Sequence, residues 1–278
     1  MLRYLLTLSR PRFWLYTAGP VVVGVAYAAS DVGELFTPLS VVLFAYFLLP
    51  ANVYLYGIND RFDRGIDAGN PKKESGPEAR WRDSPAVTAV VAAAGLLGLA
   101  LFPLTPQVAW PYLAGFFVFA TAYSAPPLRF KARPLLDSLS NGLYLLPGAA
   151  AYAALAGAHP PTAALAGGWL WTMGMHTYSA IPDIEPDRAA GIETTATALG
   201  ETRTYLYCGC CWGLAALSFA VLDPRLGALL AVYPVFLLGT VGAGVDVDRA
   251  YWWFPVVNGV VGMGLTLGGL FAMRGWLA

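Results

Sequence analysis

Long apolar segments alternate with short polar stretches along almost the whole chain. A helix needs roughly 20 apolar residues to cross the hydrocarbon core of a bilayer, and about 17 suffice at the short end of that range. Proline, glycine and charged residues fill the gaps between the apolar segments, so neighbouring helices should be antiparallel. We therefore predict nine transmembrane helices, within residues 13–29, 38–58, 86–102, 108–124, 135–157, 162–181, 205–222, 226–243 and 252–272.

The positive charges predict the orientation of this bundle. Short cytoplasmic loops keep an excess of Lys and Arg. With nine helices and a cytoplasmic N-terminus, fifteen of the seventeen Lys and Arg residues lie on the inner side, and only Arg225 and Arg274 lie outside. One missed helix would invert every later loop. The bias therefore supports nine helices and a working face on the cytoplasmic side of the cell membrane.

The composition agrees with a protein that lies mostly in lipid. Of its 278 residues, 57% are hydrophobic and 12% are charged, and the mean hydropathy is +0.56; soluble domains have about 25% charged residues. The net charge is zero, and no basic patch occurs outside the short inner loops, so we expect no binding to nucleic acid. We expect an all-α integral membrane bundle that forms a single domain over residues 1–278.

The second predicted helix ends in a cluster of polar side chains. Asn59, Asp60, Asp63 and Asp67 follow one another here, and the spacing of four residues places Asn59, Asp63 and Asp67 on one face of a continuing helix. Carboxylates at a helix C-terminus oppose the macrodipole and repel one another, so a cation should compensate them. Oxygen ligands near a phosphate suit Mg²⁺. A solvated cluster at the membrane surface is the alternative.

The sixth predicted helix ends in a similar cluster. Asp183 and Asp187 repeat the spacing of four residues, although Pro182 and Pro186 should kink or break the helix there. Both clusters follow helices that run in the same direction through the membrane. We therefore expect them to lie together at the cytoplasmic face and to share a metal ion.

The inner loop after the fourth predicted helix carries the opposite charge. Arg129 and Lys131 lie in a proline-containing stretch that follows Tyr123. Arginine binds phosphate oxygens through its planar fork, and lysine acts as a point charge. Each cation alone could equally be a positive-inside anchor. Together with the acidic clusters on the same face, they predict a site that holds a diphosphate.

At these motifs the sequence resembles the UbiA-type intramembrane prenyltransferases, over nearly its whole length. The two family motifs, NDxxDxxxD after the second helix and DxxxD after the sixth, are matched by Asn59, Asp60, Asp63, Asp67, Asp183 and Asp187. The resemblance implies a helical bundle around a central cavity, an allylic diphosphate bound through Mg²⁺, and a lateral opening to membrane lipid for the prenyl tail.

Other segments resemble the carotenoid-modifying branch of that family, the lycopene elongases. Many members with aromatic acceptors carry an arginine-rich stretch after the first motif, whereas this chain has Asn-Pro-Lys-Lys-Glu at residues 70–74. Residues 123–131 and 179–185 point to the same branch. The implied reaction adds a dimethylallyl group to each end of lycopene, with or without hydration. Prenylation of an aromatic quinone precursor is the alternative.

The resemblance and the charges together suggest roles for individual residues. The expected Mg²⁺ ligands, which are also the catalytic residues, are Asp63, Asp67, Asp183 and Asp187. The expected substrate-binding residues are Asn59, Asp60, Lys72, Tyr123, Arg129, Lys131 and Tyr178. His176 could face the cavity or could be a packed residue, and the sequence assigns no base for the final proton.

Two other classes of membrane protein have to be compared with this interpretation. A transporter would use polar residues within the helices, such as Asn52, Asn141 and Asn258, near the membrane midplane. The acidic residues here gather at one membrane face instead. The phosphatidyltransferases that use CDP-alcohols carry a combined Asp-Gly and Ala-Arg signature, which this sequence lacks. Mg²⁺-dependent release of pyrophosphate would distinguish an enzyme from a carrier.

Overall fold

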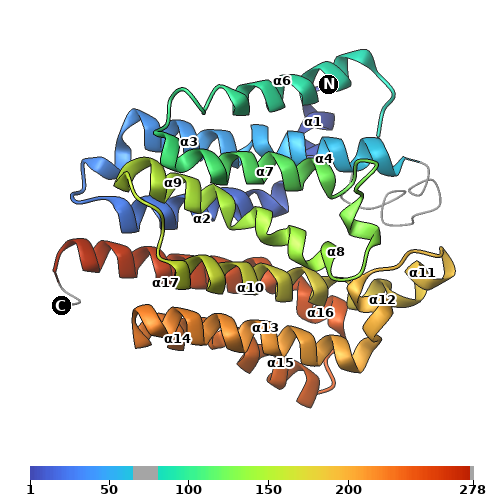
Figure 1. Ribbon diagram of the computed structural model, residues 1–278. Coiled ribbons are helices and arrows are strands. Elements are labelled where there is room, and N and C mark those ends of the chain that lie inside the picture. Colours follow the sequence, from blue (N-terminus) through green and yellow to red (C-terminus); the bar gives the residue numbers. More distant parts are fainter. Residues whose placement is uncertain (65–80, 276–278) are drawn as a thin grey trace.

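The computed structural model describes residues 1–64 and 81–275, and every regular element in these two ranges is a helix. The all-α prediction is therefore confirmed for the described part of the chain. The long helices lie side by side with their axes in roughly one direction (Figure 1). They are α2 (Trp14–Ala28), α3 (Pro38–Leu48), α4 (Pro50–Asp63), α6 (Pro85–Leu99), α7 (Trp110–Ala122), α9 (Leu146–Ala156), α10 (Thr162–Ser179), α13 (Glu201–Leu222), α15 (Val232–Gly242) and α17 (Phe254–Met273).

Short helices connect or extend the long ones. The α-helices among them are α1 (Leu2–Leu8), α8 (Leu136–Leu139), α11 (Ile184–Ala189), α12 (Thr195–Leu199), α14 (Pro224–Leu230) and α16 (Val247–Trp252). The 3₁₀ helices are η1 (Pro11–Phe13), η2 (Glu34–Phe36), η4 (Gln107–Ala109), η5 (Phe130–Ala132), η6 (Ser140–Tyr144) and η7 (Ile181–Asp183).

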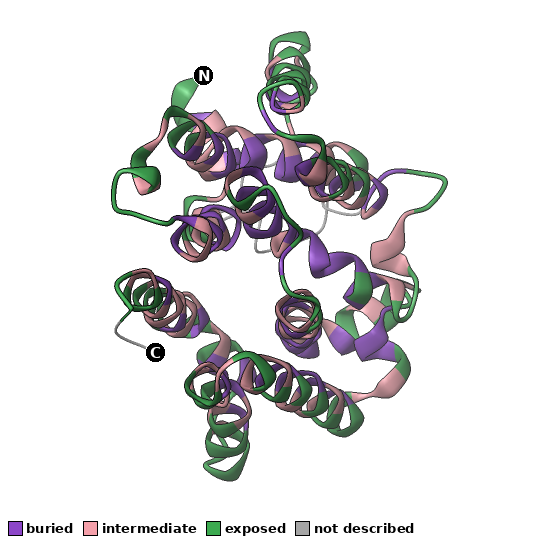
Figure 2. Cartoon of the chain, turned by 60° about the vertical axis from the view of Figure 1, so that its left-hand side comes forward, coloured by how far each residue is buried: buried purple, intermediate pink, exposed green. Residues whose placement is uncertain are grey.

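Several helices are long and apolar enough to cross a membrane. Within the described residues, four helical segments meet this condition, with α3 and α4 taken together and α14 and α15 taken together. They are Pro38–Asp63, Glu201–Leu222, Pro224–Gly242 and Phe254–Met273. Exposed side chains cover their outward faces (Figure 2), and many of these are apolar, such as Leu217, Val221 and Leu238. The protein is therefore an integral membrane protein, and the count of nine crossings stays a prediction.

A proline divides the second predicted helix into α3 and α4. Pro50 has no N–H, and the Nδ2 of Asn52 donates to the carbonyls of Phe47 and Leu48, at 3.0 Å each. Asn52 also donates to Thr17 of α2 at 2.8 Å. Asn52 is fully buried. It therefore serves this bend and the contact with α2, and it does not mark a permeation path.

The buried side chains form two large clusters. One joins α2, α3, α4, α7 and α9 around Phe47 and Phe116, and the other joins α10, α13, α15, α16 and α17 around Trp212 and Phe254. Helices α2 and α9 pack closely at Gly24 and Gly148. A Cβ atom on Gly24 would lie 2.2 Å from the carbonyl oxygen of Gly148, which leaves no room for a side chain there. Close packing of α17 against the C-terminal end of α2, at Gly269 and Ala26, connects the two halves.

Candidate functional site

The last turns of α4 carry the first acidic motif. Asp60 is almost completely buried and forms an ion pair with Arg10, with Nη2 and Oδ1 3.0 Å apart. The Arg10 guanidinium also lies 4.5 Å from the centre of the Tyr56 ring, which is a cation–π distance. Arg10 was missing from the residues predicted for the site. The sequence showed it only as one of several N-terminal arginines, and no spacing rule connects it with a residue 50 positions away.

Asp63 lies one turn further along α4 and faces the cations of the loop after α7. Lys131 forms an ion pair with Asp63, and Arg129 Nη2 lies 3.7 Å from its Oδ1. Residues of the same loop also bind Asn59 of α4. The Oδ1 of Asn59 accepts hydrogen bonds from Ser124 Oγ at 2.9 Å and from Lys131 Nζ at 3.5 Å. The structure thus brings together the first acidic motif and the cations predicted to act with it.

The loop after α7 also reaches α10, which precedes the second motif. The Tyr123 hydroxyl lies 3.4 Å from Nε2 of His176, and its ring packs edge-on against the imidazole. Because Tyr123 contacts α10 and its neighbour Ser124 contacts Asn59 of α4, the two helix ends lie on either side of one loop. Both ends, with α11 and α12, are on the right-hand side of Figure 1.

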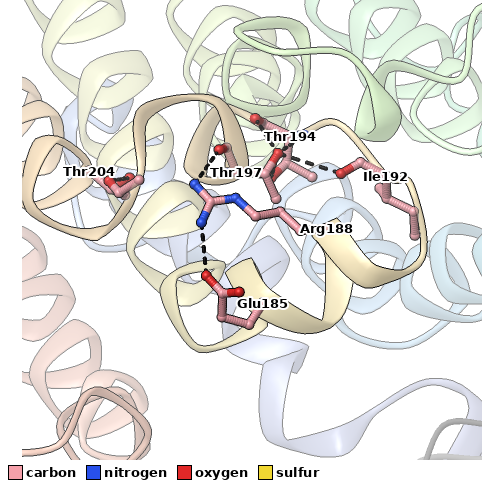
Figure 3. Close-up of polar contacts among 7 residues, drawn as sticks. Glu185, Arg188, Ile192, Thr194, Thr197 and Thr204 are labelled. Atoms are coloured by element: carbon pink, nitrogen blue, oxygen red, sulfur yellow. Dashed lines mark hydrogen bonds and ion pairs between the residues drawn. The ribbon is translucent and has the colours of Figure 1, made fainter.

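The second acidic motif lies on η7 and α11, where the chain turns away from α10. Asp183 and Asp187 are both partly exposed. Arg188 fixes this turn by donating to Glu185 at 2.8 Å and to the carbonyl of Thr197 at 2.9 Å (Figure 3). The carboxylates are therefore presented on a short, tethered helix.

The predicted metal ligands lie only partly within the described residues. Asp67 and Lys72, both predicted for the site, lie outside these residues. Within the described ranges, no three His, Cys, Asp or Glu side chains lie close enough together to hold a metal ion. The structure does place both motifs at the same end of the bundle (Figure 1).

Behind the second motif, a buried carboxylate attaches α12 to α8. Asp137 accepts hydrogen bonds from the backbone N–H of Thr195, at 2.9 Å, and from its hydroxyl. The Thr195 hydroxyl also accepts the backbone N–H of Leu135 at 2.8 Å. Asn141 lies one turn beyond and donates to the backbone of Asp137 at 2.6 Å. These polar residues hold the helices together, and the Asn141 side chain also reaches the Tyr123 hydroxyl at the charged loop.

Tyr178, predicted to bind substrate, fills the aromatic cluster of the second half. Its ring centroid is 5.2 Å from that of Phe254 and 5.7 Å from that of Trp212. Tyr251 of α16 packs on Phe254 at 5.6 Å, and burial raises the pKa of its phenol to about 12. These phenols belong to the wall of the bundle, whereas Tyr123 lies at the charged loop.

An apolar cavity of about 580 Å³ opens between α2, α9, α10, α14 and α17. Arg12 and Tyr16 line the end of the cavity beside the start of α2, and Tyr27 and Leu226 line its opposite end. Tyr16 packs edge-on against Tyr144, with ring centroids 6.1 Å apart. The Tyr144 hydroxyl lies 3.4 Å from that of Tyr56, which lies under Arg10. A short series of aromatic side chains thus connects the cavity with the acidic end of α4.

Residues 17–253 match the sequence profile of the UbiA prenyltransferase family. The chain belongs to this family. The resemblance inferred from the two acidic motifs is confirmed, and the protein is a UbiA prenyltransferase. Membership of this family excludes the two alternative classes, the transporters and the phosphatidyltransferases.

Near full-length relatives of this UbiA protein share one name. The chain is 68% identical over 270 residues to the lycopene elongase/hydratase of Haloferax volcanii, covering 97% of this chain and 89% of that protein. It is 64% identical over 274 residues to the lycopene elongase/hydratase of Halobacterium salinarum, covering 98% and 99%. These matches agree with the branch inferred from residues 70–74, 123–131 and 179–185.

Solved structures show the same fold at low sequence identity. A UbiA homologue from Archaeoglobus fulgidus bound to DMAPP and Mg²⁺ is similar with a TM-score of 0.80 and 20% identity, covering 97% of this chain and 98% of that chain. A UbiA homologue from Aeropyrum pernix K1 has a TM-score of 0.69 and 19% identity, covering 95% and 98%. The all-helical membrane bundle is therefore the UbiA fold.

Proposed function

We propose that this UbiA protein is a lycopene elongase/hydratase of carotenoid biosynthesis, which transfers a dimethylallyl group from DMAPP to each end of lycopene and adds water. Near full-length similarity to relatives that carry this name supports the proposal. The observation that carries the chemistry is the pairing of Asp63 with Lys131 and Arg129 at the acidic end of α4, close to a long apolar cavity.

Mg²⁺ fits the donor atoms of the two motifs. The Oδ1 atom of Asp63 is buried and, although it lies beside two cations, it accepts no hydrogen bond of normal geometry from any residue that the structure describes. A hard, anionic oxygen of this kind suits a magnesium ion that also binds phosphate. We propose that Asp63, Asp67, Asp183 and Asp187 hold the ion, and that Asn59 and Asp60 orient them. When bound, Mg²⁺ neutralises charge on the diphosphate.

The cations of the loop after α7 act on the leaving group. The Lys131 ammonium and the Arg129 guanidinium face the position where the diphosphate would lie beside Asp63. As the carbon–oxygen bond of the donor breaks, negative charge grows on the diphosphate oxygens, and these cations stabilise it. Lys72, which lies outside the described residues, is proposed to act in the same way.

Aromatic rings next to the motif stabilise the allylic cation. Tyr56, Tyr144 and Phe13 lie between the acidic end of α4 and the cavity, with Phe13 at 6.4 Å from Tyr56 and 5.2 Å from Tyr16. The negative faces of such rings attract a cation, and the apolar walls keep bulk water away from it. The cavity then supplies space for the long hydrocarbon of the acceptor, whose terminal double bond attacks the cation.

The nine predicted crossings and the cytoplasmic N-terminus belong to this proposal. The distribution of Lys and Arg supports them, and it favours a position of both acidic motifs at the cytoplasmic face of the cell membrane. A water-soluble diphosphate would then reach the site from the cytoplasm, and the lipophilic acceptor would reach it from the membrane.

Expression in cells that accumulate lycopene tests the function directly. Mass analysis of the pigments should show products in which lycopene has gained one and two five-carbon units, each with the elements of one water molecule. Asp63→Asn, which keeps the size of the side chain and removes its charge, should abolish these products, as should removal of Mg²⁺ from the purified protein. Unchanged lycopene together with prenylation of a quinone precursor would replace the proposed acceptor, and normal activity of Asp63→Asn would refute the metal role.

A further inference from the structure

The imidazole of His176 contacts the loop after α7 from the last turn of α10. Its Nε2 lies 3.4 Å from the Tyr123 hydroxyl, and the two rings pack edge to face at an interplanar angle of 84°. The other histidine of the chain, His159, precedes α10 at the opposite end of that helix, where its Nδ1 lies 2.9 Å from the Tyr112 hydroxyl. The same pair of side chains thus occurs twice, once beside the acidic motifs and once at the far end of α10.

The Tyr123 hydroxyl has partners on two sides. Asn141 forms a side-chain hydrogen bond with it, and the Nδ2 of Asn141 also donates to the carbonyl of Asp137 at 2.6 Å. An imidazole nitrogen without a proton is an acceptor, so the Tyr123 O–H donates to Nε2 when His176 is neutral. The phenol oxygen is itself an acceptor, and it can take a proton from a third group while it gives its own to the imidazole.

A fixed negative charge lies near this pair. Asp137 is buried, accepts two hydrogen bonds from Thr195, and interacts electrostatically with His176. A carboxylate that is held in place stabilises an imidazolium that forms beside it. The helix that carries the imidazole is held as well, because Thr177 of α10 donates to Ser138 of α8 at 2.8 Å. The surroundings therefore suit a histidine that gains a proton during the reaction.

Tyr123 also lies close to the proposed position of the diphosphate. The next residue, Ser124, donates to Asn59 of α4 at 2.9 Å. The backbone carbonyl of Tyr123 accepts the N–H of Lys131 at 3.0 Å, and the Lys131 ammonium pairs with the first motif. The carbon that carries the diphosphate is one bond from the leaving oxygen, so the reacting carbons lie near this loop. Tyr123 and His176 are both partly exposed, which allows a substrate to reach the pair.

We propose that Tyr123 and His176 together accept the proton that the prenyl transfer releases. This inference rests on the proposed function. The terminal double bond of the acceptor forms a carbon–carbon bond with the donor, and the diphosphate leaves with the electron pair of the broken carbon–oxygen bond. The acceptor cation is then neutralised in one of two ways. Either a neighbouring C–H bond gives up its proton and its electron pair forms a double bond, or a lone pair of added water forms a carbon–oxygen bond and the water loses a proton.

One proton leaves the acceptor in either case. It passes to the Tyr123 oxygen, while the proton of that hydroxyl passes to Nε2 of His176, so Tyr123 stays neutral and His176 becomes an imidazolium beside Asp137. Tyr123 is the catalytic residue, and His176 is a positioning residue that acts through it. Without this acceptor, formation of the carbon–carbon bond reverses, and water captures the allylic cation as a free prenyl alcohol. The pair thus determines how often release of the diphosphate leads to transfer.

His176→Gln separates the transfer of a proton from the hydrogen bond. Glutamine keeps an acceptor for the Tyr123 hydroxyl, but its amide does not take up a proton near neutral pH. His159→Gln is the matched control, because it makes the same change beside the same type of partner at the other end of α10. The purified full-length proteins are supplied with lycopene, DMAPP and Mg²⁺, and pyrophosphate, free prenyl alcohol and prenylated pigment are measured in each reaction.

The expected result is a loss of coupling between the two halves of the reaction. His176→Gln should form prenylated pigment about 10²-fold more slowly, the low end of the effect of a general base, while pyrophosphate release falls by less than about tenfold. The ratio of pyrophosphate to pigment should therefore rise by about tenfold or more, and the difference should be recovered as prenyl alcohol. The KM for DMAPP should change by less than about threefold, and His159→Gln should behave as the wild type does.

Each outcome decides a different point. Lycopene left unchanged by the wild-type protein refutes the proposed function, on which the inference rests. A wild-type ratio of pyrophosphate to pigment in His176→Gln overturns the proton role, whether both rates are normal or both have fallen alike, because a purely structural residue changes them together. If His176→Gln does not fold, Tyr123→Phe takes its place, since it removes the hydroxyl and keeps the ring. A wild-type ratio in that variant also overturns the proposal.

Discussion

Thr195→Val is expected to weaken the attachment of the second motif to the rest of the bundle. Valine replaces the hydroxyl by a methyl group of similar size, so packing changes little. The hydroxyl donates to the buried carboxylate of Asp137 and accepts the backbone N–H of Leu135 at 2.8 Å. Leu135 has a φ of 68°, a conformation that a leucine adopts only when its surroundings hold it there. The buried Asp137 carboxylate therefore loses a contact that it cannot replace with solvent.

The magnitude follows from these contacts. A hydrogen bond to a charged group contributes about 1.5–3 kcal/mol. The backbone N–H of Thr195 still donates to Asp137 at 2.9 Å, so part of the clamp remains. We expect the variant to lose about 2–3 kcal/mol, which corresponds to a fall in Tm of roughly 5–10 °C for a protein of this size.

Thermal unfolding of the purified protein in detergent measures this loss. Thr266→Val is the matched control, because the Thr266 hydroxyl donates to the carbonyl of Gly262 within its own helix at 2.8 Å. This control should change stability by less than about 0.5 kcal/mol. If Thr195→Val and Thr266→Val have the same Tm, the clamp between α8 and α12 does not contribute to stability as argued here.

Two further predictions concern the cations of the loop after α7. Lys131→Met should lower kcat/KM for DMAPP by about 10²-fold, the effect of losing one electrostatic group at a developing charge, while the exposed control Arg203→Met should leave it unchanged. Arg129→Gly should be more stable than Arg129→Ala by about 1 kcal/mol, because Arg129 has a φ of 40° and glycine adopts this conformation without strain. Both Arg129 variants should transfer more slowly than the wild type, and equal Tm values for the two would contradict the strain argument.

The sequence predicts the large-scale features because they depend on local pattern. Apolar length predicts helices, and the spacing of the aspartates places Asn59 and Asp63 on one face of α4, where both meet Lys131. Proline signals also hold, since the chain turns away from α10 near Pro182. The prediction that Arg129 and Lys131 act with the first motif rested only on their expected position at the same membrane face as that motif. The structure shows that the two cations contact the motif.

Contacts over long distances in sequence could not be predicted in this way. Arg10 pairs with Asp60, and Asp137 pairs with Thr195, across 50 and 58 residues of chain. No periodicity connects such residues, and each looks ordinary in its own segment. The same holds for Tyr16, whose ring is one of many aromatic side chains in the sequence. Only the packing shows that its ring lies against that of Tyr144, at the wall of the cavity.

The backbone at Arg10 and Arg129 connects these long-range contacts with the chemistry. Both residues have a positive φ, at 50° and 40°, in two separate loops, and both direct a guanidinium towards the acidic end of α4. Non-glycine residues seldom adopt this conformation, and it persists where the surrounding structure holds it. Two such positions at one site indicate that the loops are shaped to present positive charge there. A membrane helix that ends in carboxylates needs this charge in the absence of substrate, and a diphosphate can use the same cations when it binds.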